Sequence, residues 1–196
     1  MPRVLNYTKN VACLESLWDS DLENRLSILP LLDITSKTTS NRHIYLTCNT
    51  KAELRYNLGL LAGKKKYGVL LLAFHGEPGE IELAEKVFVD LEELADMMQK
   101  GFAGWVIHFA SCGTIKADEA RLVDFVKRTG VAMVMGYTKK VDWTESAVMD
   151  LLVLRWLQYY KDLSALLRHL QKSYGDLIAI TGFHAYPGPA PEQSGS

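Results

Sequence analysis

Residues 68–76 read GVLLLAFHG, and they indicate the class of fold more clearly than any other part of the sequence. The run from Gly68 to Phe74 is apolar without interruption, which is typical of a strand that is buried on both faces of a sheet. Strands of that kind belong to parallel sheets with helices packed on either side. The run ends in His75 and Gly76. The sequence therefore predicts a histidine at the carboxyl end of a central strand.

Short apolar runs alternate with amphipathic helical stretches on both sides of this strand. We expect further strands at 11–14, 43–48, 105–110, 131–135 and 177–180, and a small hairpin from 81–83 and 86–89. We expect helices from Trp18 to Leu29, from Thr50 to Gly63, from Asp90 to Met98, over 117–128, from Asp142 towards Tyr160 and over 163–173, with a loop at 35–41. Strands that alternate with helices pair in parallel through right-handed crossovers. The predicted fold class is a three-layer α/β/α domain with a mostly parallel sheet of about six strands.

Composition and charge narrow the class of protein. The chain has 196 residues, of which 48% are hydrophobic, and a net charge of -1. We expect one globular domain over 1–186 and a mobile tail, rich in Pro, Gly and Ser, over 187–196. The balanced charge argues against a nucleic-acid or anionic-membrane surface, and no apolar stretch is long enough to cross a bilayer. Three cysteines without a CxxC pair, and no secretory signal pattern, favour a cytoplasmic location.

Two predicted strands end in groups that can do chemistry together. The buried run quoted above delivers His75 and Gly76, and the next central strand delivers Cys112 and Gly113. If these strands are neighbours, their carboxyl ends lie about 5 Å apart in the pairing direction. An imidazole can take the proton of a thiol and later protonate a leaving amine, so the pair suits nucleophilic catalysis. The adjacent glycines leave backbone N–H groups accessible to an oxyanion.

The residues around this pair resemble a known family. LLLAFHGEPG (70–79) and WVIHFASCGT (105–114) look like the paired signatures of the caspase–haemoglobinase fold of cysteine peptidases, also called clan CD. The segment 131–157 is similar to the next strand and helix of its CHAT branch, and the resemblance covers about residues 68–160. It implies a caspase-like fold and a hydrolase of the thiol protease type that needs no metal or cofactor. In that case Cys112 is the nucleophile, His75 the general base and acid, and the amides of Gly76 and Cys112 the oxyanion donors.

The same resemblance implies a regulated protease that cleaves a protein partner, as in a bacterial antiviral defence or cell-death pathway. An upstream activator or sensor protein, dimerisation or self-cleavage would then order the active site. The predicted last strand, 177–180, would lie at the edge of the sheet. An edge strand can pair with a second copy, so we expect a homodimer through this strand.

Two carboxylates are the candidate substrate-binding residues. Glu15 and Asp142 fall near the ends of the first strand and of the strand after the nucleophile, where this fold builds its specificity pocket. Carboxylates there would favour a lysine or arginine before the scissile bond. Asp142 also fits a helix N-cap, with Glu145 three residues later, and solvent exposure is the default for Glu15.

Other interpretations compete with the peptidase. A zinc site of Cys13, Cys48, Cys112 and His75 matches no usual ligand spacing. An α/β-hydrolase-like esterase would need a GxSxG nucleophile elbow, which the sequence lacks. His108 lies inside a strand and is expected to be a packed, hydrogen-bonded core residue. A caspase-like adaptor that keeps both residues but performs no catalysis stays open.

Overall fold

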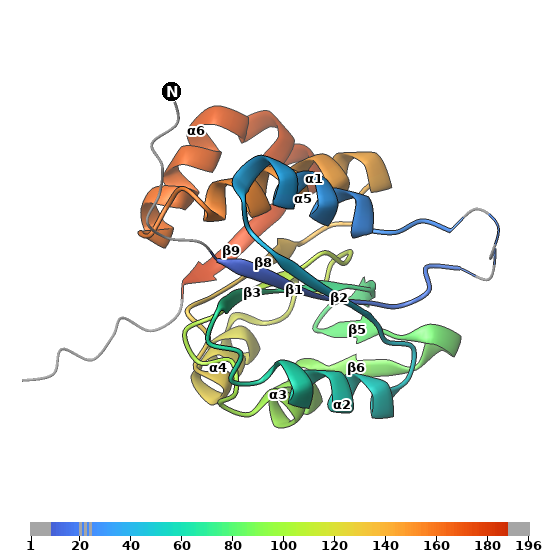
Figure 1. Ribbon diagram of the computed structural model, residues 1–196. Helices are drawn as coiled ribbons and strands as arrows, with labels where there is room; N and C mark the ends of the chain where they lie inside the picture. Colours follow the sequence, from blue (N-terminus) through green and yellow to red (C-terminus); the bar gives the residue numbers. More distant parts are fainter. Residues whose placement is uncertain (1–8, 20, 22, 24, 188–196) are drawn as a thin grey trace, which may run out of the picture.

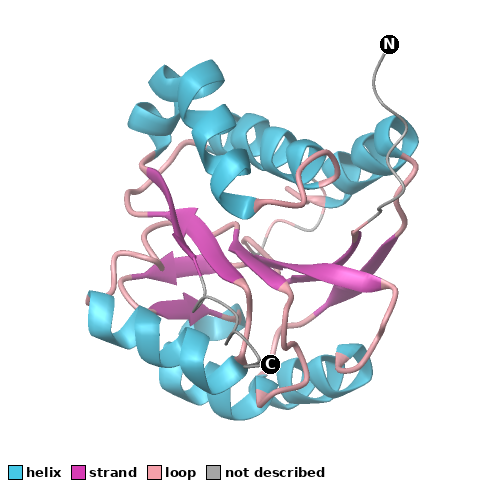
Figure 2. Cartoon of the chain, turned by 90° about the vertical axis from the view of Figure 1, so that its left-hand side faces the viewer, coloured by secondary structure: helices cyan, strands magenta, loops and turns pink. Residues whose placement is uncertain are grey.

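The predicted three-layer α/β/α arrangement is confirmed by the computed structural model, which describes residues 9–19, 21, 23 and 25–187. A central sheet lies between two layers of helices, as Figures 1 and 2 show from two sides. The predicted mobile tail lies outside the described residues, apart from Pro187.

Within the described residues, the main sheet has six strands. They are β1 (Asn10–Glu15), β2 (His43–Thr47), β3 (Tyr67–Ala73), β7 (Val106–Phe109), β8 (Met133–Tyr137) and β9 (Phe183–Pro187). Their order across the sheet is β2-β1-β3-β7-β8-β9, and all neighbours are parallel except β8 and β9. Because β2 and β3 lie on opposite sides of β1, the order of the strands reverses there. Such a switch point opens a crevice at the carboxyl ends of the strands.

In the part of the chain that the structure describes, three helices pack against each face of the sheet, and Figure 1 shows the two layers. They are α1 (Leu29–Thr39), α5 (Trp143–Leu157) and α6 (Leu163–Thr181) on one face, and α2 (Lys51–Leu61), α3 (Leu91–Met98) and α4 (Glu119–Thr129) on the other. A small antiparallel sheet follows β3, with the order β4 (His75–Glu77), β5 (Glu80–Glu82) and β6 (Phe88–Asp90) and a short 3-10 turn at Ala84–Lys86. The predicted hairpin is thus part of a larger unit that begins at His75.

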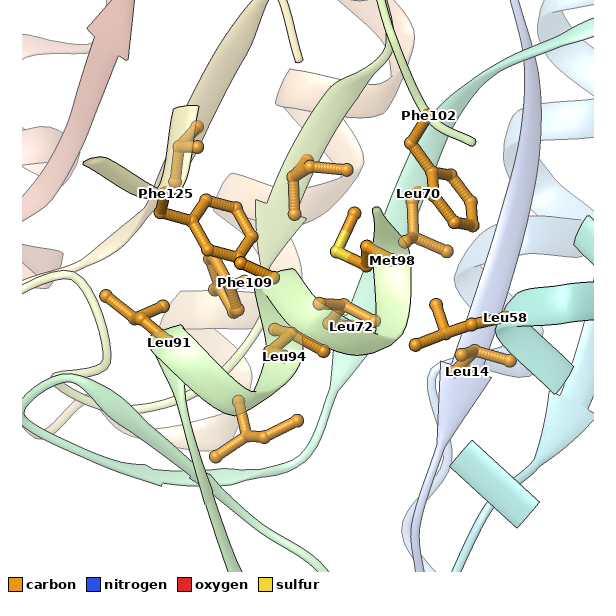
Figure 3. Packing of buried hydrophobic residues seen from close by; sticks show 14 of the residues in the cluster. Leu14, Leu58, Leu70, Leu72, Leu91, Leu94, Met98, Phe102, Phe109 and Phe125 are labelled. Atoms are coloured by element: carbon orange, nitrogen blue, oxygen red, sulfur yellow. The ribbon is translucent and has the colours of Figure 1, made fainter. Parts of the chain in front are cut away.

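The central strands are buried on both faces, as their apolar runs predict. In β3, Leu70 and Leu72 face the layer of α2, α3 and α4, whereas Val69 and Leu71 face the layer of α1, α5 and α6. Figure 3 shows Leu72 and its neighbours packed against α3 in the first of these layers. Burying one such side chain stabilises the fold by roughly 1.5–3 kcal/mol, so β3 is a firm support for the groups at its end.

The first predicted helix is wrong. The described residues between β1 and Leu29 form a loop, and the helix runs instead through most of the predicted loop at 35–41. Pro30 fits the first turn of α1, where its missing N–H costs no hydrogen bond. The hydroxyls of Thr35 and Thr39 donate to the carbonyls of Leu31 and Thr35 within the helix. Threonines that bond back in this way are tolerated in a helix.

The predicted last strand is also wrong, because Leu177–Ile180 belongs to α6. Leu177 and Ile178 pack against the core from this helix. The helix ends at Gly182, whose φ of +62° is a left-handed cap, and the last strand β9 follows it. A short apolar run does not distinguish helix from strand by its period. Helical residues offer no unpaired strand edge, so the expected homodimer through 177–180 loses its basis.

Several predicted helix starts are confirmed. Thr50 and Glu53 form a capping box at α2, and Asp90 accepts the Glu93 amide at 2.7 Å at α3. None of the helices in the described part of the chain is long and apolar enough to cross a membrane.

Candidate active site

A cavity of about 240 Å³ opens at the carboxyl edge of the main sheet. Its walls come from the loop after β1, the end of β3, the segment after β7, and β8 with the loop and helix α5 that follow it. His75 and Cys112 both line it. Strands β3 and β7 pair in parallel, with Leu72 beside Phe109. The prediction that the two strands end side by side is therefore confirmed, and both ends reach one cavity.

The His75 ring is oriented by a backbone carbonyl. Its Nε2 lies 2.5 Å from the oxygen of Trp18, and the Trp18 indole lies edge-on to the ring with centroids 5.2 Å apart. Since a carbonyl oxygen only accepts, Nε2 carries the proton, and Nδ1 of a neutral ring is the atom that can receive one. A base whose far nitrogen is held by a third group is the arrangement that an activated nucleophile needs.

The Cys112 thiol is half-buried and rests against the loop before α5. Its Sγ accepts from the Val141 amide at 3.5 Å and lies 3.8 Å from the Val141 carbonyl oxygen. Among the described residues, no hydrogen bond joins Sγ to the His75 ring. Proton transfer to His75 therefore requires the thiol to turn away from Val141, a change in a single side-chain torsion angle.

The backbone around Cys112 is tied to the small sheet. The Ser111 hydroxyl lies 2.7 Å from the Thr114 hydroxyl, which donates to the Glu80 carbonyl at 3.0 Å. The Gly79 amide donates to the Thr114 carbonyl at 2.9 Å. The Cys112 amide makes no hydrogen bond with any described residue, so it can donate to an oxyanion. The loop is thus held rigidly while one of its donors stays available.

Gly76 packs directly under this loop. A Cβ at position 76 would lie 2.2 Å from the Thr114 hydroxyl oxygen and 2.6 Å from the Cys112 carbonyl oxygen. Both distances are far below van der Waals contact, so only glycine lets β4 approach the loop at 111–114 this closely. The predicted role of the Gly76 amide as an oxyanion donor stays a prediction, but its close approach to Cys112 is a structural fact.

We expect Gly76→Ala to displace the loop at 111–114. The new methyl group must push residues 111–114 away, which should lower the free energy of unfolding by about 2 kcal/mol. It should also slow reactions of Cys112 by about 10²-fold, because a displacement of about 1 Å has that effect on a site. Urea unfolding and the rate of thiol alkylation check both values. Gly59→Ala in α2, where a Cβ meets nothing within 4 Å, is the matched control. An unchanged alkylation rate in Gly76→Ala would contradict the expectation.

Glu15 lies outside the cavity wall and is 2% exposed, so its expected solvent exposure is wrong. Its carboxylate accepts from the Trp18 indole N–H at 2.8 Å and the Ile28 amide at 2.7 Å. It also accepts from the Ser27 hydroxyl at 2.7 Å and from the Tyr45 hydroxyl. Burial, and next the hydrogen bond to Glu15, raise the pKa of Tyr45 to about 12. Glu15 thus anchors the loop that carries the Trp18 carbonyl, and its oxygens are occupied.

Asp142 is the N-cap of α5, as its spacing from Glu145 predicts. Its carboxylate accepts from the amides of Thr144 at 2.8 Å and Glu145 at 3.4 Å. The side chain is exposed and is not part of the cavity wall. The structure therefore brings His75, Gly76 and Cys112 together, but it uses Glu15 and Asp142 elsewhere.

Sequence reasoning missed the carboxylate that does reach the cavity. Asp150, on the third turn of α5, is 2% exposed and lines the cavity wall. Its Oδ1 accepts from His108 Nε2 at 2.5 Å and from the Tyr137 hydroxyl. Burial, and then the charge of Asp150, raise the pKa of Tyr137 well above its usual range. The only signal in the sequence was an acidic residue that interrupts an apolar helix. His108 is confirmed as a buried, hydrogen-bonded core residue.

The family described as "Family of unknown function (DUF6642)" matches residues 8–187. The chain belongs to this family. No curated protein matches the sequence. The match spans the cavity, His75 and Cys112, so the candidate site is part of the DUF6642 domain itself, and its chemistry has to be argued from the residues present.

The two other cysteines of this DUF6642 domain are buried thiols. Burial raises the pKa of Cys13 well above its usual range and that of Cys48 to about 12. In the described part of the chain, no cluster of three or more His, Cys, Asp or Glu side chains could hold a metal ion.

Proposed function

We propose that this protein is a cysteine endopeptidase that cleaves a protein substrate through Cys112 and His75. The observation that carries the proposal is that the two side chains lie just beyond the carboxyl ends of the adjacent parallel strands β3 and β7 and line one cavity. The hydrogen bond from His75 Nε2 to the Trp18 carbonyl supports it, because it leaves Nδ1 as the proton acceptor.

The residues present account for each proton in such a reaction. Nδ1 of His75 takes the thiol proton, and the Cys112 sulfur forms a bond to the peptide carbonyl carbon. The carbonyl oxygen becomes an oxyanion, to which the amides of Cys112 and Gly76 would donate. His75 then gives its proton to the leaving amine as the C–N bond breaks. Water then loses a proton to His75 and attacks the thioester carbonyl carbon. The C–S bond breaks, and His75 returns the proton to the Cys112 sulfur. Throughout, the Trp18 carbonyl stabilises the imidazolium.

A regulated role, in a bacterial defence or cell-death pathway, is part of the proposal. Its support is the resemblance to the CHAT branch and the resting position of the thiol against Val141. A form in which the thiol points away from its base turns over slowly until a substrate or an activator protein reorients it. The upstream activator is therefore expected to act on the loop that holds Val141 or on the loop that holds Trp18.

The second candidate is a caspase-like signalling or adaptor module without catalysis. One observation favours it: the hydrogen bonds of the Cys112 thiol run to Val141 rather than to His75. In an adaptor, the cavity would bind a partner segment, and the thiol would be a packing group of the loop.

Thiol labelling distinguishes the two functions. At pH 7.5 we expect iodoacetamide and a peptide epoxide to modify Cys112 alone. Cys13 and Cys48 are buried, and a raised pKa keeps each of them as the unreactive thiol at this pH. His75→Ala should slow labelling of Cys112 by about 10²-fold. Mass spectrometry of the digested chain locates the label. Slow labelling of all three cysteines, independent of His75, would support the adaptor instead.

A further inference from the structure

A buried carboxylate, that of Asp150, forms part of the cavity wall. Asp150 is buried, and its Oδ1 holds both of the neutral donors that reach it, the His108 ring and the Tyr137 hydroxyl. No described residue donates a hydrogen bond to Oδ2. The second oxygen of this carboxylate is therefore available to a ligand that enters the cavity.

The charge of Asp150 is not neutralised by His108. The His108 ring is fully buried, and its Nδ1 has no hydrogen-bond partner among the described residues. A protonated ring would bury an N–H donor at Nδ1 without an acceptor, whereas a neutral ring leaves only a lone pair there. The neutral tautomer with its proton on Nε2 therefore fits the site. No lysine or arginine side chain pairs with Asp150 in the described part of the chain. A buried carboxylate of this kind is stabilised by any cation that can reach it.

The rest of the cavity suits a long apolar stem. Its walls include the side chains of Trp18, Leu26, Ile28, Phe74, Val141 and Trp143. Apart from His75, the described residues that line it include no basic side chain, whereas Asp19 adds a second carboxylate. Lysine and arginine place methylene groups along apolar surfaces and their charge against carboxylates or aromatic faces.

We propose that this cavity binds the side chain of a lysine or arginine, with Asp150 as the residue that receives its charge. This inference rests on the proposed function: because Cys112 lines the same cavity, the bound residue is the one before the scissile bond. The carboxylate that selects basic residues is then Asp150 rather than Glu15 or Asp142.

Binding can be measured without catalysis. In full-length Cys112→Ala protein, we expect argininamide to bind at least about tenfold tighter than citrullinamide, which has the same length but a neutral head. Lysinamide should likewise bind more tightly than norleucinamide, which lacks the ammonium group. Asp150→Asn should remove the difference in affinity between the charged and the neutral ligand of each pair. Asp142→Asn changes a carboxylate outside the cavity and should keep this difference. Calorimetry or chemical-shift titration gives the affinities. Equal affinity for argininamide and citrullinamide, or an undiminished difference in Asp150→Asn, would overturn the proposal.

A second variant covers the case in which Asp150→Asn does not fold. Ala147 lines the cavity from α5, one turn before Asp150, so Ala147→Lys offers the carboxylate an internal ammonium and leaves the network with His108 intact. We expect this variant to melt near the wild-type temperature and to lose argininamide binding. Unchanged binding would count against the proposal.

Hydrolysis separates this inference from the peptidase itself. Fluorogenic peptides that differ only before the cut should be cleaved at least about tenfold faster after arginine or lysine than after leucine, glutamine or aspartate. Cation binding without cleavage of any peptide would support the cavity proposal and contradict the peptidase. Cleavage without a preference for basic residues would support the peptidase and overturn the cavity proposal.

Discussion

Replacing Cys112 or His75 by alanine is expected to lower peptide hydrolysis by at least about 10³-fold, because the nucleophile and its base act as one unit. The folded state should be nearly unaffected. Cys112 is half-buried and His75 is exposed, so neither truncation leaves a large cavity in the core. The double variant should be no slower than the slower single variant, since either change already removes the shared step.

Two matched variants show whether the loss belongs to the site. Cys48→Ala removes a thiol that is buried away from the cavity, and His184→Ala removes an exposed imidazole on β9. Both should keep the wild-type rate. The rates come from a fluorogenic peptide assay, and circular dichroism melts confirm folding. Hydrolysis that persists in Cys112→Ala or His75→Ala would contradict the dyad, and a wild-type protein that hydrolyses no peptide would favour the adaptor.

The parts of the fold that sequence could predict are those encoded locally. The run at 68–74 predicts a doubly buried strand, and both faces of β3 are indeed covered. Thr50 and Asp90 each cap a helix by accepting a hydrogen bond from the amide three residues later. Because both partners lie within one short segment, the local sequence predicts the cap. The placement of His75 and Cys112 in one cavity follows from the rule for the carboxyl ends of parallel strands.

The predictions that failed concern segments whose structure depends on contacts between residues distant in the sequence. The spacing from Trp18 to Leu29 is helical, yet Glu15 holds the Trp18 indole and the Ile28 amide in a loop. No local pattern shows that a carboxylate will be buried and satisfied by donors up to 30 residues away, as Glu15 is by Tyr45. The prediction of a strand at Leu177–Ile180 failed for a different reason. An apolar run of four residues is too short for its hydrophobic periodicity to distinguish helix from strand.

Asp150 shows why the specificity carboxylate could not be found from sequence. It lies within an apolar helix, and its partners His108 and Tyr137 come from two different strands. An aspartate in such a helix reads as a surface position, since charged residues are almost never buried unless paired. Only the tertiary structure brings the three groups together and places Asp150 and Tyr137 in the wall of one cavity.

Replacing Glu15 by alanine is expected to lower the free energy of unfolding by roughly 4 kcal/mol, because four donors lose their acceptor at once. The Ile28 amide is buried and the other three donors are half-buried, so water replaces the carboxylate poorly. The loop that Glu15 anchors also carries the Trp18 carbonyl, which holds His75 Nε2. We therefore expect faster amide hydrogen exchange at Leu17 and Ile28 and slower alkylation of Cys112. The pKa of Tyr45, raised to about 12 in the wild type, should fall toward its ordinary value.

Asp142→Ala is the matched control, since it removes the other carboxylate that the sequence assigned to substrate binding. It deletes a helix N-cap, which costs about 1 kcal/mol, and leaves the loop after β1 anchored. Urea unfolding compares the two variants, and hydrogen exchange followed by mass spectrometry reports on the loop. If Glu15→Ala were no less stable than Asp142→Ala, or if the loop exchanged at the wild-type rate, Glu15 would not be the anchor of the Trp18 carbonyl. The orientation of His75 would then have to come from the packing of the Trp18 ring against His75 and Trp143.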